Sequence, residues 1–145
     1  MSKITPFLWF DAPLSEAIAY YRRIFPHMRV LRESDESAAF EIEGQRFNAL
    51  NGGPRYSFNE AISLMIDCED QDEVDYYWGR LSAEGEERMC GWLEDKYGLS
   101  WQVIPRALGR YLGDPDREKA DRVVDAMLQM RKIDIAALDR AAAGE

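Results

Sequence analysis

The chain contains an internal repeat of about 55 residues, which constrains its fold more than any other feature. A strand-like run ends at Asp11 and leads into a helical segment, and the same succession recurs 56 positions later at Asp67. Residues 44–50 resemble residues 98–104 at an offset of 54. A repeat of this size is one supersecondary unit, so the pattern predicts two similar modules packed around a shared site.

Each copy shows the pattern of one strand, one helix and three further strands. In the first copy, an apolar and aromatic run at residues 4–10 predicts a strand, and apolar residues at helical spacing predict a helix from Leu14 to Phe25. In the second copy, residues 61–68 predict a strand, and Asp70 is expected to cap a helix that stops before Gly85. The remaining strands are expected at residues 29–31, 38–42 and 46–51, and at residues 87–89, 90–93 and 99–104.

The segment after Pro105 lies outside the repeat and is predicted to be helical. Asp114 followed by Pro115 resembles a helix start, and a second helix is expected after Asp134, with Ile133 and Leu138 as a hydrophobic staple. The fold class is therefore α+β, and we expect one domain over residues 1–145. Its parts are module one at 3–54, module two at 58–105 and a helical tail at 106–143, whose apolar stripe must cover a sheet face or a partner subunit.

Charge and composition exclude several classes of function. The net charge of −9 and the pI of about 4.7 disfavour binding to nucleic acid or to anionic membranes. No apolar run reaches membrane-spanning length and the N-terminal residues do not resemble a signal peptide, so we expect a cytoplasmic protein. Cys68 and Cys90 lack the spacing of a zinc site.

Four segments carry a resemblance to a known family. They are ITPFLWF at 4–10, ALNGGP at 49–54, FNEAIS at 58–63 and CGWLEDKYGLSWQ at 90–102. Together they resemble the PhnB-like branch, often labelled 3-demethylubiquinone-9 3-methyltransferase, of the glyoxalase, bleomycin-resistance and dihydroxybiphenyl dioxygenase (vicinal oxygen chelate) superfamily. The resemblance extends over essentially the whole chain, tail helices included. It implies that two tandem βαβββ modules form a half-open β-barrel cleft.

The resemblance also implies where a metal ion would bind. Metalloenzymes of the superfamily take one ligand from the first strand and one from the last strand of each module, and these ligands are His, Glu or occasionally Gln. In this sequence the corresponding positions are Phe7, Asn48, Ser63 and Gln102. Catalytic divalent metals require imidazole or carboxylate donors, so we predict no metal and no cofactor. The single histidine, His27, follows Pro26 in a predicted loop and is expected at the surface.

The same positions predict the lining of a cavity. Strand alternation places Trp9 with Phe7, and Trp92 on a neighbouring strand can add a wall. The candidate ligand-binding residues are Phe7, Trp9, Asn48, Ser63, Gln102, Trp92 and Cys90. Alternatives remain open: the aromatic residues can simply fill core volume, the amides of Asn48 and Gln102 can satisfy each other, and Cys90 can be a nucleophile or a buried structural thiol.

These observations predict a metal-free protein that binds an aromatic or apolar small molecule, acts as a homodimer, and binds neither nucleic acid nor membranes. The alternatives are a glyoxalase- or dioxygenase-like enzyme with a displaced metal site, and the methyltransferase of the family label. The latter is disfavoured because the glycines at Asn51-Gly52-Gly53-Pro54 do not lead into a helical start, as a methyl-donor site usually requires. Catalytic residues are not identified by the sequence.

Overall fold

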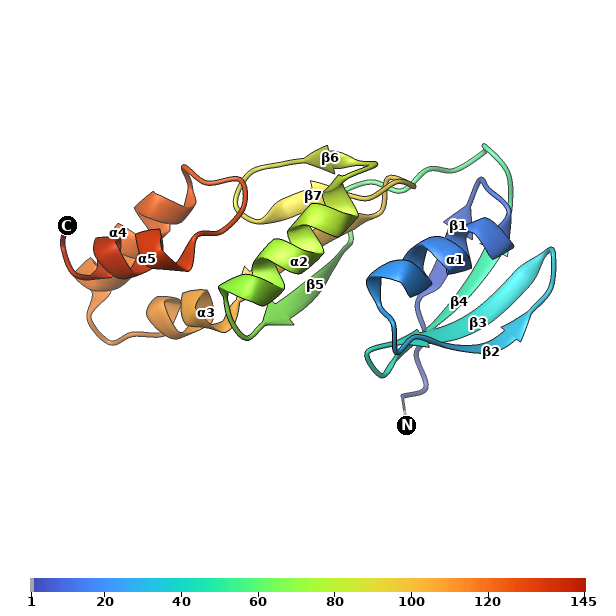
Figure 1. The fold of residues 1–145 in the computed structure, drawn as a ribbon, viewed down its shortest axis with the longest axis horizontal. Coiled ribbons are helices and arrows are strands. Elements are labelled where there is room, and N and C mark those ends of the chain that lie inside the picture. Colours follow the sequence, from blue (N-terminus) through green and yellow to red (C-terminus); the bar gives the residue numbers. More distant parts are fainter. Residues whose placement is uncertain (1) are drawn as a thin grey trace. The chain divides into compact units, whose positions relative to one another are not determined.

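The computed structural model describes residues 2–145, which divide after Phe58 into two compact units (Figure 1). The first unit contains β1 (Phe7–Phe10), α1 (Leu14–Ile24), β2 (Arg29–Glu33), β3 (Ser37–Ile42) and β4 (Gln45–Asn51). The second contains β5 (Ser63–Cys68), α2 (Gln71–Ser82), β6 (Glu86–Glu87), β7 (Trp92–Glu94) and β8 (Ser100–Pro105). The predicted βαβββ order is therefore present twice, which confirms the α+β fold class.

The two sheets have the same topology. The strand orders are β1-β4-β3-β2 and β5-β8-β7-β6, and in each sheet the first strand pairs in parallel with the last strand of its module. One face of each sheet packs against its helix: Phe10 lies 6.2 Å from Tyr21 of α1 between ring centroids, and Leu93 and Val103 are buried on the α2 side. The opposite face of each sheet carries no helix of its own module.

The start of α2 follows from its sequence. The Asp70 carboxylate accepts a hydrogen bond from the backbone N–H of Glu73 at 3.0 Å, and the Glu73 carboxylate accepts one from the N–H of Glu69 at 2.7 Å. This reciprocal pair satisfies two N–H groups at the start of the helix. The predicted cap at Asp70 is confirmed.

The turn between β7 and β8 is organised by one buried carboxylate. Asp95 is only 2% exposed, and its Oδ1 accepts hydrogen bonds from the backbone N–H groups of Tyr97 (2.8 Å) and Leu99 (3.1 Å). Its Oδ2 accepts a hydrogen bond from Nε1 of Trp101 at 2.9 Å. A buried charge is tolerated where several donors surround it, so Asp95 fixes both the turn and the start of β8.

Several strand boundaries differ from the prediction. The first strand starts at Phe7 instead of residue 4, and β7 starts at Trp92 instead of residue 90. Cys90 and Gly91 have φ angles of 60° and 83°, and this left-handed turn cannot continue a strand. The predicted strand at 87–89 is the two-residue β6 at 86–87.

The tail forms three helices: α3 (Arg106–Leu112), α4 (Arg117–Met127) and α5 (Ile135–Ala142). The N-cap of α4 is Asp116 and not the predicted Asp114, because the Asp114 carboxylate instead accepts from the N–H of Asp116 at 2.9 Å. Asp134 caps α5, and Ile133 and Leu138 are both fully buried, as the staple predicted. None of the helices among residues 2–145 is long and apolar enough to cross a membrane.

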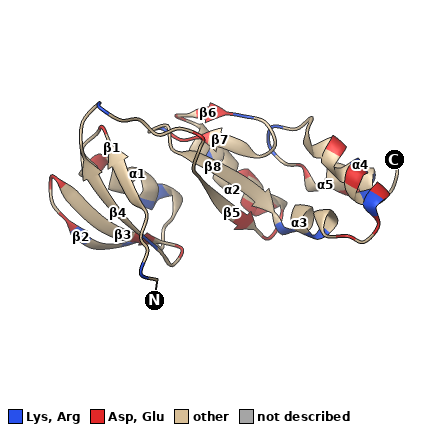
Figure 2. Cartoon of the chain, turned by 180° about the vertical axis from the view of Figure 1, so that it is seen from behind, with Lys and Arg blue, Asp and Glu red and all other residues tan. Residues whose placement is uncertain are grey.

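Charged residues of both signs are interspersed along helices and strand ends, with acidic residues prominent on α4 and at the turn between β2 and β3 (Figure 2). This distribution agrees with the excess of acidic residues in the sequence. It is typical of solvated surfaces.

Candidate functional site

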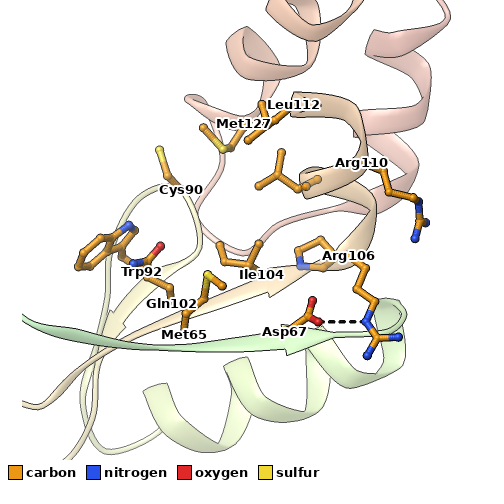
Figure 3. A pocket seen from close by; sticks show the side chains of 13 residues that line it. Met65, Asp67, Cys90, Trp92, Gln102, Ile104, Arg106, Arg110, Leu112 and Met127 are labelled. Carbon is orange, nitrogen blue, oxygen red and sulfur yellow. Dashed lines mark hydrogen bonds and ion pairs between the residues drawn. The ribbon is translucent and has the colours of Figure 1, made fainter. Parts of the chain in front are cut away.

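A groove of about 610 Å³ lies on the open face of the second sheet (Figure 3). Its floor is formed by β5, β7 and β8, and one side is formed by α3 and the end of α4. The residues that line it are Met65, Asp67, Cys90, Trp92, Gln102, Ile104, Pro105, Arg106, Leu108, Gly109, Arg110, Leu112 and Met127. The volume is within the range of small-molecule sites in proteins.

Strand alternation explains which side chains reach the groove. Gln102 pairs with Met65 on one side and with Trp92 on the other, so these three side chains share a face of the sheet. Their neighbours Leu93 and Val103 point to the opposite face, under α2, and are fully buried. Met65 is 62% exposed, which is unusual for a large apolar side chain and marks the face as one that a ligand or partner can cover.

The floor of the groove contains a neutral carboxamide, that of Gln102. Nε2 of Gln102 donates to Oγ of Ser63 at 2.9 Å, which fixes the orientation of the carboxamide. Figure 3 shows this carboxamide between Trp92 and Met65. The carbonyl oxygen of Gln102 can therefore accept a hydrogen bond from a hydroxyl or N–H group of a bound molecule.

The charges at the end of the groove near α3 compensate one another. Nε of Arg106 lies 3.0 Å from Oδ2 of Asp67, and Nη1 lies 3.4 Å from Oε1 of Glu69. Both members of the closer pair are about half exposed, so the pair contributes little stability. Its consequence for the site is that Arg106 is already neutralised by carboxylates. The other cation of the lining, Arg110, points away from the groove in Figure 3, so the groove favours uncharged molecules.

The two cysteines differ sharply in environment. Cys90 is partly exposed at the rim of the groove, so the interpretation of Cys90 as a buried structural thiol is wrong. Cys68 is fully buried, and burial, reinforced by nearby Glu73, raises the pKa of its thiol to about 12. Neither cysteine forms a disulfide. Only Cys90 is placed to report on occupancy of the groove.

We expect N-ethylmaleimide at pH 8 to modify Cys90 and not Cys68 in the folded protein. The thiolate is the reactive form, and both burial and the raised pKa suppress it at Cys68. Intact mass spectrometry should show one adduct under native conditions and two in denaturant. The Cys90→Ser variant should show none when folded, and rapid modification of that variant would contradict the assignment.

The other predicted site residues lie on the open face of the first sheet. Phe7 is 59% exposed and pairs with Asn48 of β4. Nε1 of Trp9 donates to the carbonyl oxygen of Gly53 at 2.9 Å, and the Trp9 ring meets that of Tyr56 edge-on at a centroid distance of 4.9 Å. Ser63, Gln102, Trp92 and Cys90 thus come together in the second unit, and Phe7, Trp9 and Asn48 come together in the first.

The sheet registers reveal a residue that sequence matching missed. Asn48 faces Phe7 across its ladder, but Gln102 faces Met65, while Ser63 faces Ser100. The residue in the place of Phe7 is therefore Met65, two positions beyond the Ser63 given by the repeat. The offset of 56 residues that relates Asp11 to Asp67 also relates Phe7 to Ser63, but this offset does not hold along the whole strand.

The residues at the expected ligand positions do not fit a divalent metal. Phe7 and Met65 offer no oxygen or nitrogen donor, and Asn48 and Gln102 offer neutral amides. Within residues 2–145, no three His, Cys, Asp or Glu side chains are grouped so that they could hold an ion. His27 is exposed in the loop after α1, as predicted.

The glycines of the first unit do not form a methyl-donor site either. The segment after β4, residues 52–62, contains no helix. A Cβ atom on Gly52 would lie 2.3 Å from the Trp9 ring, so this glycine is required by the packing of Trp9. The strand–turn–helix geometry that presents backbone N–H groups to a ligand is not formed at this position.

Comparison with known proteins agrees with this geometry. A sequence model of the family described as 3-demethylubiquinone-9 3-methyltransferase matches residues 2–104. The PhnB protein from Bacillus cereus is 28% identical, with a TM-score of 0.65 over 72% of this chain and 99% of that one. The match of the family ends before the tail, so the expectation that the resemblance includes the tail helices is wrong.

More distant structures share the fold. Protein PA1353 from Pseudomonas aeruginosa has a TM-score of 0.59 at 16% identity, covering 72% of this chain and 98% of its own. The fosfomycin resistance protein FosX from Listeria monocytogenes, in a complex with Mn(II) and sulfate, has a TM-score of 0.54 at 20% identity, covering 77% of this chain and 98% of its own. A search of curated proteins gave no match.

Proposed function

The chain belongs to the 3-demethylubiquinone-9 3-methyltransferase family of the glyoxalase (vicinal oxygen chelate) superfamily, and from this premise we propose that it is a metal-free protein that binds an uncharged apolar or aromatic small molecule. The observation that carries the proposal is the groove of about 610 Å³ on the second sheet. Its apolar lining, its single oriented carboxamide at Gln102 and its compensated Arg106 suit such a ligand.

The proposal includes the loss of the metal chemistry that other superfamily members use. FosX from Listeria monocytogenes was crystallised with Mn(II), and its fold is shared by this chain. Here the ligand positions carry Phe7, Asn48, Met65 and Gln102, which supply no imidazole or carboxylate. An enzyme with a displaced metal site is the alternative, and stoichiometric zinc, nickel, iron or manganese in elemental analysis of the purified protein would support it instead.

The proposal also includes a homodimer. Phe7 and Met65 are large apolar residues that are more than half exposed, each on the open face of its own sheet. A second copy could cover part of this surface, because closed two-fold dimers are the commonest assemblies of soluble proteins. In that assembly the ligand would be shielded from water more fully than in the groove alone.

The binding proposal is tested with the neutral fluorescent probe N-phenyl-1-naphthylamine. We expect saturable fluorescence enhancement, protection of Cys90 from N-ethylmaleimide, and a thermal midpoint raised by about 5 to 10 °C at a probe concentration of one hundred times Kd. The substitution Gln102→Ala should weaken binding of a probe with an N–H donor by about tenfold.

S-adenosylmethionine serves as the matched negative control in the same assay. It should neither displace the probe nor shift the thermal midpoint, because Gly52 and Gly53 are engaged with Trp9. Failure of the probe to bind, or modification of Cys90 at an unchanged rate when the probe is bound, would exclude the groove as the site. Saturable binding of S-adenosylmethionine would favour the methyltransferase alternative.

A further inference from the structure

Helices α3 and α4 of the tail supply one wall of the groove, although they lie outside the family match. Seven of the thirteen lining residues are at or beyond Pro105, whereas the match to the family ends at residue 104. The duplicated core alone therefore provides a floor, and the tail turns that floor into a groove. A wall added to a shared core is suited to select among ligands, because it lies outside the part that matches the family.

The wall is attached to the sheet through backbone hydrogen bonds. The N–H of Cys90 donates to the carbonyl oxygen of Met130 at 2.7 Å, and the N–H of Gly91 donates to that of Arg131 at 2.8 Å. A Cβ atom on Gly91 would lie 2.9 Å from Cδ1 of Ile104. The loop before β7 and the loop after α4 thus pack together with no space for a side chain.

Side-chain hydrogen bonds join the tail to α2 and join two helices of the tail to each other. The Gln71 amide of α2 donates to the carbonyl oxygen of Ile133 at 3.0 Å and accepts from the N–H of Ile135 at 2.8 Å. The Tyr111 hydroxyl of α3 donates to the Asp139 carboxylate, an interaction that raises the pKa of Tyr111. The tail also has a core of its own, formed by Leu108, Val123, Ile133, Leu138 and Ala142. This wall of the groove is therefore preformed in the protein without a ligand.

Two apolar side chains of the wall face the groove. Leu112, at the end of α3, is 40% exposed, and Met127, at the end of α4, is partly exposed. Figure 3 shows both on the side of the groove opposite Gln102 and Met65. A molecule that donates a hydrogen bond to Gln102 would extend its apolar part toward them.

We propose that Leu112 and Met127 set the length of the uncharged apolar ligand that the groove admits, so that the tail determines specificity. This inference rests on the proposed function. It predicts that enlarging the wall excludes the probe and that trimming it admits longer molecules. Each methylene added to a ligand raises the affinity about fourfold as long as the new methylene contacts the groove. A limit on ligand length therefore appears as the chain length beyond which affinity no longer rises.

The test measures binding of N-phenyl-1-naphthylamine and its displacement by straight-chain primary alcohols of six to twelve carbons. Met127→Trp and Leu112→Trp should each weaken probe binding at least tenfold. In Met127→Ala, the alcohol chain length at which affinity stops rising should increase by one or two carbons. Circular dichroism and thermal midpoints measured for every variant distinguish a changed wall from an unfolded tail.

The matched control is Leu128→Trp, which places the same side chain one residue further on, at a half-exposed position outside the groove lining. It should leave probe affinity within twofold of the wild type. If the wild type binds the probe and folded wall variants bind it equally well with the same length limit, the inference is overturned while the proposed function stands. If the wild type itself does not bind, the proposed function fails.

Discussion

Replacing Asp95 with alanine should lower the free energy of unfolding by about 3 to 5 kcal/mol. The carboxylate is 2% exposed and accepts hydrogen bonds from two backbone N–H groups and from the indole of Trp101. Alanine removes the acceptor and leaves these donors in a region closed to water. Urea denaturation followed by circular dichroism measures the loss, and the start of β8 should lose protection from hydrogen exchange.

Two further variants define the origin of this effect. Asp95→Asn keeps one oxygen for the N–H groups of Tyr97 and Leu99 but turns an amide N–H₂ toward Nε1 of Trp101, so about half the loss is expected. Asp121→Ala, on the exposed face of α4, should change stability by less than about 0.5 kcal/mol. Equal stability of Asp95→Ala and the wild type would show that the turn does not depend on the carboxylate.

The second large effect is expected from Leu138→Ala in α5, at about 2 to 5 kcal/mol. Leu138 is fully buried in the tail core with Leu108, Val123 and Ile133, and truncation leaves a cavity among them. Because this core supports the wall of the groove, the loss should be accompanied by weaker binding of N-phenyl-1-naphthylamine. Chemical denaturation gives the first quantity and probe fluorescence gives the second.

Leu128→Ala provides the comparison within the same tail. Leu128 is half exposed, so its truncation should cost less than about 0.5 kcal/mol and leave probe binding unchanged. A similar cost for the two leucine substitutions would mean that the tail helices do not pack as a core of their own.

The regular parts of the fold were predictable because their signals are local. The repeat gave both βαβββ modules, and side-chain caps gave the starts of α2 and α5 at Asp70 and Asp134. Helix α3 lies in the segment predicted to be helical, but its bounds were not predicted, because it has no side-chain cap and only seven residues, and begins directly after the strand residue Pro105. The sequence does not distinguish Asp114 from Asp116 as the N-cap of α4, because both residues precede the same apolar stripe. The hydrogen bonds of their carboxylates identify Asp116 as the cap.

The site was predictable only in part because its walls come from distant segments. Trp92 was expected to add a wall to the cavity from a neighbouring strand, and in the sheet it pairs with Gln102. Ser63, and not Met65, was predicted at the position equivalent to Phe7, because the register of a parallel pair is not readable from the spacing of the helices between strands. Leu112 and Met127 reach the groove only through tertiary packing of the tail, for which the sequence holds no local signal.

The parallel pairing of the first and last strands of each module, Phe7 with Asn48 and Met65 with Gln102, places the strand by which the chain enters a module beside the strand by which it leaves. A unit closed in this way can be copied in tandem by gene duplication without redirecting any of its internal connections. Only a short linker is then needed to join the copies, and the two halves are free to diverge. Here three helices follow the second copy, whereas the first copy is followed directly by the linker.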